Sequence, residues 1–226
     1  MTVNNKIAKA IGALFIVTML LGMIDAYTVA PLLNQPLEQI SSHENRVFVG
    51  AFSVLLMSIG VVGIAVLFYP ILETTNKSIA ITYVCSRVME CLLLLTGVII
   101  YFLLISLSQK YIGEGYPKNS YYQTLSQIAI EARYGAYHVA MIILSIASMM
   151  LCALMYKSRL IPRLISIVGF VGYTMVLLSA PLDILDIIDT TSTGGILYVP
   201  GAIFEILLLP IWLFAKGFKL SDSIST

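Results

Sequence analysis

Arg87 and Glu90 stand three residues apart in the stretch from Tyr83 to Glu90, which lies inside a long apolar segment. On a helix this spacing places both side chains on one face. A charge at the centre of a membrane helix costs about 2.5–3.5 kcal/mol on insertion scales, so such residues normally have a partner and often a function. We therefore interpret Tyr83, Arg87 and Glu90 as part of a polar ligand-binding site within a membrane.

A second carboxylate, Glu205, is expected at a similar depth. A rise of 1.5 Å per residue places Glu90 about 4 Å from the middle of its segment and Glu205 within about 5 Å of the midplane. Pro210 cannot donate to the carbonyl of Ile206, so the backbone beside Glu205 needs another partner or a cavity. Arg87 can neutralise one glutamate, and the other must be protonated, meet water or face a cation. The alternative is a structural network that only fixes helix packing.

Four more titratable residues are expected nearer the outer surface: Asp25, His138, Asp183 and Asp186. The same rise places Asp25 about 8 Å and His138 about 10 Å outward of the midplane. We expect them to line a cavity that opens outward, with Arg87 at its floor. The alternatives are a hydrogen-bonded core histidine and, for the two aspartates, a solvated helix end.

A metal site made of His138, Asp183 and Asp186 is one further alternative. We expect no metal and no cofactor, because the chain has only two histidines and its three cysteines lack the spacing of metal ligands. The two histidines also cannot pair across a haem in the membrane, since His43 falls in a predicted loop.

The elements that position these residues are membrane helices. The chain is 59% hydrophobic and 11% charged, with a mean hydropathy of +0.94, whereas soluble domains carry roughly 25% charged residues. About 20 apolar residues span a bilayer core. We predict an all-α fold, one transmembrane domain over residues 1–226 built as a bundle of six helices. The predicted helices cover about residues 7–33, 47–72, 78–107, 133–156, 164–182 and 198–216, with residues 123–132 as a separate surface helix.

The distribution of basic residues predicts the orientation. One predicted side of the membrane carries Lys6, Lys9, Lys77, Lys157, Arg159, Arg163, Lys216 and Lys219. The other side carries Arg46, Lys110, Lys118 and Arg133. Since the richer side is normally cytoplasmic, both termini are expected in the cytoplasm.

Several of these features together resemble the bacterial domain-of-unknown-function family 4386. They are Arg87-x-x-Glu90, His138, the turn from Arg159 through Pro162 and Arg163 to Gly169, and Pro200-x4-Glu205 followed by Trp212-x3-Lys216-Gly217. The resemblance covers nearly the whole chain. It implies a six-helix protein of the bacterial inner membrane and brings no established activity.

The function that these residues favour is binding of a membrane lipid or a small amphiphilic ligand by a multi-pass protein of the cell membrane. An intramembrane acid-base enzyme using Glu90, Glu205 and His138 is one alternative, although no nucleophile motif is visible. A proton- or cation-coupled transporter, in which six helices form one protomer of a homo-oligomer, is another, and a purely structural subunit is a third. The nearly balanced charge gives no indication of a nucleic-acid partner.

Overall fold

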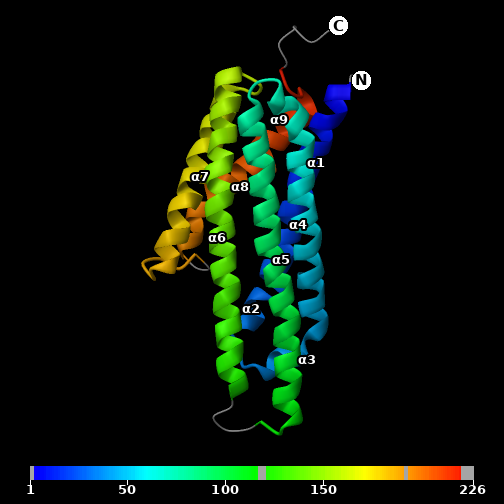
Figure 1. The fold of residues 1–226 in the computed structure, drawn as a ribbon, viewed down its shortest axis with the longest axis vertical. Coiled ribbons are helices and arrows are strands. Elements are labelled where there is room, and N and C mark those ends of the chain that lie inside the picture. The colour runs from blue at the N-terminus through cyan, green and yellow to red at the C-terminus, as the bar shows by residue number, and fades with distance from the viewer. Residues whose placement is uncertain (1–2, 117–120, 191–192, 220–226) are drawn as a thin grey trace.

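The computed structural model describes residues 3–116, 121–190 and 193–219, and over these ranges the chain is helical without any strand (Figure 1). The elements are α1 (Val3–Thr28), α2 (Ala30–Leu33), α3 (Glu38–Ser42), α4 (Glu44–Glu73), α5 (Lys77–Gly113), α6 (Tyr121–Ser158) and α7 (Arg163–Ile184), then a 3-10 turn (Thr193–Tyr198), α8 (Val199–Ile203), a π-helical segment (Phe204–Leu208) and α9 (Leu209–Ala215).

Within the described residues, six stretches are long and apolar enough to cross a membrane, so the prediction of a six-helix membrane protein is confirmed. They are Asn5–Leu33, Glu44–Glu73, Lys77–Gly113, Tyr121–Ser158, Arg163–Ile184 and Gly194–Ala215. The start of α1 and the end of α9 lie at the same end of the bundle, as an even number of crossings requires (Figure 1). Lys118 and residues 220–226 lie outside the described part of the chain.

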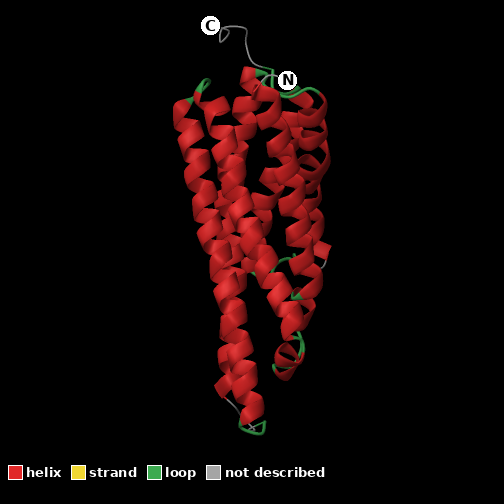
Figure 2. Cartoon of the chain, turned by 90° about the vertical axis from the view of Figure 1, so that its right-hand side faces the viewer, coloured by secondary structure: helices red, strands yellow, loops and turns green. Residues whose placement is uncertain are grey.

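The start of the fourth long helix differs from the prediction. Helix α6 begins at Tyr121 rather than near Arg133, so the separate surface helix predicted over residues 123–132 is wrong. The polarity that suggested an interface belongs to the exposed side of α6, where Gln123 and Gln127 lie. Its other side is apolar and packs along α5, with Tyr122 and Ala129 buried in the same cluster as Leu107. The α5–α6 pair extends beyond the rest of the bundle (Figure 2).

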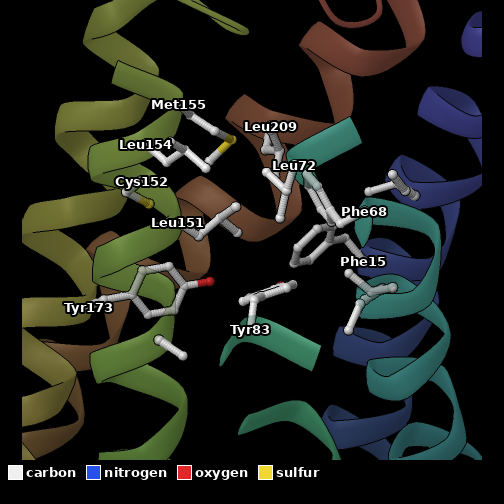
Figure 3. Close-up of a cluster of buried hydrophobic side chains, with 14 of the residues drawn as sticks. Phe15, Phe68, Leu72, Tyr83, Leu151, Cys152, Leu154, Met155, Tyr173 and Leu209 are labelled. Atoms are coloured by element: carbon white, nitrogen blue, oxygen red, sulfur yellow. The ribbon is translucent and has the colours of Figure 1, made fainter. Parts of the chain in front are cut away.

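Two buried apolar clusters fill the bundle, one toward each end. The first includes Phe15, Phe68, Tyr83 and Tyr173 and lies in the half that holds the chain ends. In Figure 3, Tyr83 and Tyr173 lie at one edge of this cluster, and the hydroxyl group of Tyr173 points toward Tyr83. The second cluster includes Tyr101 and joins α2 and α3 to α4, α5 and α6. The polar residues lie between the two clusters.

Small residues bring α1 against α4 and so fix the depth of Asp25. A side chain at Gly50 would place its Cβ 2.2 Å from Val29 and 3.1 Å from Oδ1 of Asp25, and a side chain at Gly60 would meet Thr18 at 2.5 Å. In membranes, where lipid is as apolar as leucine, such close backbone approach is a main source of helix association. The glycines of α4 therefore hold Asp25 against the bundle.

A second close approach joins α7 to α8. The Cβ of a side chain at Gly172 would lie 2.6 Å from the backbone nitrogen of Gly201 and 2.9 Å from the carbonyl carbon of Pro200. This contact lets the backbone that precedes Glu205 lie against the turn of α7 that carries Tyr173. The two glycines thus set the distance between the side chains of Tyr173 and Glu205.

Gly172→Ala is expected to lower the free energy of unfolding by about 1–3 kcal/mol, the usual cost of overpacking, because the added methyl group meets backbone that cannot rotate away. The measurement is thermal unfolding in detergent. Gly135→Ala in α6 is the matched control, since no atom lies within 4 Å of its new Cβ. Helix propensity alone makes that control neutral or slightly stabilising. Equal melting temperatures for the two variants would contradict the proposed close contact.

Candidate functional site

A cavity of about 600 Å³ lies between the two apolar clusters. Phe15 and Val176 line it from the first cluster, and Val54 and Tyr101 from the second. The acidic, basic and histidine residues that line it within the described chain are Asp25, Arg87, Glu90, Arg133, His138 and Glu205. Five of these six are among the residues selected from the sequence. The cavity therefore joins polar groups of α1, α5, α6 and the π-helical segment in one space.

Arg87 lies at one edge of this cavity and is 2% exposed. Its Nη1 donates to Oε2 of Glu90 at 2.9 Å, and its Nε and Nη2 donate to the hydroxyl oxygen of Tyr83 at 3.1 and 3.0 Å. The helical spacing of three and four residues sets these contacts, because all three side chains leave the same face of α5. Tyr83 holds Arg87 in place through these two hydrogen bonds, but Tyr83 does not itself line the cavity.

Glu205 faces Arg87 from the other side of the bundle. Its Oε1 lies 3.9 Å from Nη2 of Arg87 and accepts a hydrogen bond from the hydroxyl group of Tyr173. The side chain of Glu205 is 15% exposed, against 4% for Glu90. Glu205 is thus the more accessible and the less directly neutralised of the two glutamates.

The π-helical segment supplies the irregular backbone that Pro210 predicts. It covers Phe204–Leu208 and includes Ile206, whose carbonyl a proline at position 210 cannot bond. Single π turns inside α-helices often occur at functional sites. Here the widened turn carries Glu205 on the cavity side of the helix.

Asp25 is held by Arg133, which the sequence analysis took as the first residue of a membrane helix. Nη2 of Arg133 donates to Oδ2 of Asp25 at 2.9 Å, and the hydroxyl group of Tyr101 donates to Oδ1 at 2.7 Å. The guanidinium carbon of Arg133 lies 4.6 Å from the centroid of the Tyr101 ring and 5.6 Å from that of Tyr134. This cluster ties α1, α5 and α6 together.

His138 pairs with Asp183 at the end of α7. Nε2 of His138 lies 2.8 Å from Oδ2 of Asp183. Thr190 holds the same carboxylate in place, with its N–H on Oδ1 at 3.1 Å and its hydroxyl group on Oδ2 at 2.8 Å. An ionised carboxylate accepts only, so Nε2 carries the proton that is shared with Asp183. Nδ1 of His138 is buried and has no hydrogen-bond partner among the described residues.

Asp186 is not brought to the cavity. It is exposed, has a φ of 54° in the turn after α7 and does not line the cavity. The three-residue metal site of His138, Asp183 and Asp186 accordingly does not form. In the part of the chain that the structure describes, no group of three or more His, Cys, Asp or Glu side chains is arranged to hold a metal ion.

The sequence analysis missed Arg133, Tyr101 and Tyr173 as site residues. A signal for Arg133 was present, because Asp25 is an isolated acid in an apolar run and needs a basic partner at its own depth. Arg133 instead marked the start of a helix that in fact begins at Tyr121. Tyr101 and Tyr173 carry no such signal, since tyrosine is tolerated both in cores and at interfaces.

The arrangement can hold a polar group inside an apolar space. Two arginines of the cavity lining face three carboxylates, counted over the described residues, so the formal charge of the lining is one negative with His138 neutral. Arg87 bonds Glu90 and Tyr83, and Arg133 bonds Asp25 and lies over the Tyr101 ring. Negative charge is therefore in excess over positive charge in this lining.

Comparison with known proteins gives one finding on the family. The model of a family described as a domain of unknown function (DUF4386) matches residues 10–217. Neither a search of curated proteins nor one of solved structures gives a match.

Proposed function

The chain belongs to the DUF4386 family, and from that premise we propose that it is a membrane-embedded binding protein for a lipid or small amphiphilic ligand. The observation that carries the proposal is the cavity of about 600 Å³ between the two apolar clusters. Small-molecule sites typically enclose about 300–1,000 Å³, with mostly apolar walls and a few placed polar groups. The apolar chain of an amphiphile would pack against these walls, and its polar head would contact the polar groups.

Binding accounts for these residues better than catalysis does. No serine or cysteine is among the described residues that line the cavity, so a nucleophile of that kind next to His138 is missing. Arg87 and Arg133 are each locked by three or more contacts, which suits a fixed binding site. We place the protein in a bacterial cell membrane with both chain ends in the cytoplasm, following the distribution of basic residues.

Native mass spectrometry of gently solubilised protein tests the proposal, with Ala202→Phe as the variant. Ala202 lines the cavity, and a phenylalanine there would occupy the space of the ligand. We expect a stoichiometric bound mass on the wild type, or on wild type incubated with dodecanol, and at least a tenfold lower occupancy in the variant.

Ile203→Phe is the matched control. Ile203 is the next residue of α8, is 41% exposed and does not line the cavity. It should keep the bound mass. A mass that survives Ala202→Phe would place the ligand on the lipid-facing surface, and a wild type that stays bare even with dodecanol would contradict the proposal.

A further inference from the structure

We infer that the ligand's polar head is a protonated amine, held by Glu205 and by the tyrosine rings of the cavity. The inference rests on the proposed function, and it adds the chemical class of the head group. Two separate features of the cavity lead to it: the charge balance and the aromatic lining.

The charge balance calls for a cation. Asp25 is neutralised by Arg133 at 2.9 Å, and Glu90 by Arg87 at 2.9 Å. Glu205 shares the same Arg87 only at 3.9 Å. A carboxylate without its own counter-ion is costly in a buried site, and a bound ammonium group removes that cost through a charge-assisted hydrogen bond.

The aromatic lining suits the same group. Tyr101, Tyr134, Tyr137, Tyr173 and Tyr198 all line the cavity. The face of an aromatic ring attracts cations, by about 0.5–1 kcal/mol at exposed sites and about 2 kcal/mol or more where water is excluded. Arg133 already stacks on Tyr101 and Tyr134, which leaves the rings of Tyr137, Tyr173 and Tyr198 for a ligand.

An anionic head group does not fit this cavity. Arg87 donates from Nε, Nη1 and Nη2 to Glu90 and Tyr83. Arg133 donates to Asp25 at 2.9 Å. The described lining has three carboxylates against two guanidinium groups, so an anionic head group would add to an excess of negative charge.

Three probes with the same alkyl chain test the head group: dodecylamine, dodecanol and dodecanoate. Each is titrated onto purified full-length protein at neutral pH, and the one-to-one complex is counted by native mass spectrometry. Ala202→Phe gives the background from surface binding. We expect dodecylamine to bind at least tenfold more tightly than dodecanol, and dodecanoate to bind most weakly.

Glu205→Gln should abolish the preference for the amine and leave the affinity for dodecanol within about twofold. The ranking on wild-type protein needs no variant, so it tests the inference even if Glu205→Gln fails to fold. Cavity-dependent binding in which dodecanol or dodecanoate equals the amine would overturn this inference and leave the proposed function standing. Absence of cavity-dependent binding by every probe would overturn both.

Discussion

Replacing Arg87 with alanine is expected to lower the free energy of unfolding by about 3–5 kcal/mol, the usual cost of breaking a buried ion pair from one side. The truncation leaves Glu90 without its partner at 2.9 Å and Glu205 without its nearest positive charge. It also removes both donors to the Tyr83 hydroxyl oxygen. The side chain of Arg87 is 3% exposed, so water cannot replace these contacts.

Unfolding in detergent, followed by circular dichroism, measures this effect. The matched control is Lys110→Ala, which truncates an exposed basic residue in the same helix and should change stability by less than about 0.5 kcal/mol. In the double variant Arg87→Ala with Glu90→Ala, part of the lost free energy of unfolding should be recovered, because one of the two carboxylates left without a partner is removed as well. A melting temperature equal to that of the wild type would contradict the buried pairing.

The second large effect is expected for Arg133→Met. It should destabilise the protein by about 2–3 kcal/mol, which is less than for Arg87→Ala. The side chains of Arg133 and Asp25 are each 13% exposed, so solvent weakens this ion pair more than the buried one. Methionine retains the apolar stem that lies next to Gly97 of α5, and it removes the charge. The loss therefore reports the bond to Asp25 and the contact with the Tyr101 ring.

Asp25→Asn tests the same pair from the other side, since it keeps the shape and removes the negative charge. It should cost a similar amount, and combining it with Arg133→Met should cost less than the two separate losses together. Strictly additive losses would show that the two residues do not interact. Arg46→Met, at an exposed position of α4, is the control for loss of a surface arginine.

The membrane helices were predictable because hydropathy over a length of about 20 residues is the strongest signal a chain can carry. All six segments were found, and most ends fell within a few residues of the observed ones. The start of α6 was missed because the early part of this helix, near Gln123 and Gln127, packs on α5 beyond the apolar core. Only the tertiary contact makes that polar stretch part of the helix.

The candidate site was predictable where charge and helical spacing act within one helix. Arg87 and Glu90 meet because they are three residues apart, and Glu205 was placed near them by depth alone. Partners that lie on different helices were not predictable in the same way. Tyr173 reaches Glu205 only because Gly172 and Gly201 bring their backbones together, and a pattern within one segment does not contain that distance.

Helices α5 and α6 both line the cavity, and both are longer than a bilayer core is thick. Helix α5 has 37 residues and is therefore about 55 Å long, against a hydrocarbon core of about 30 Å. Arg87 and Glu90 sit on this helix, and Arg133 and His138 on its partner α6. If this pair tilts as a rigid unit by about 5°, a point about 25 Å from the pivot moves by about 2 Å. A small rearrangement around a ligand in the cavity would then move the far end of the pair, which the ligand does not touch.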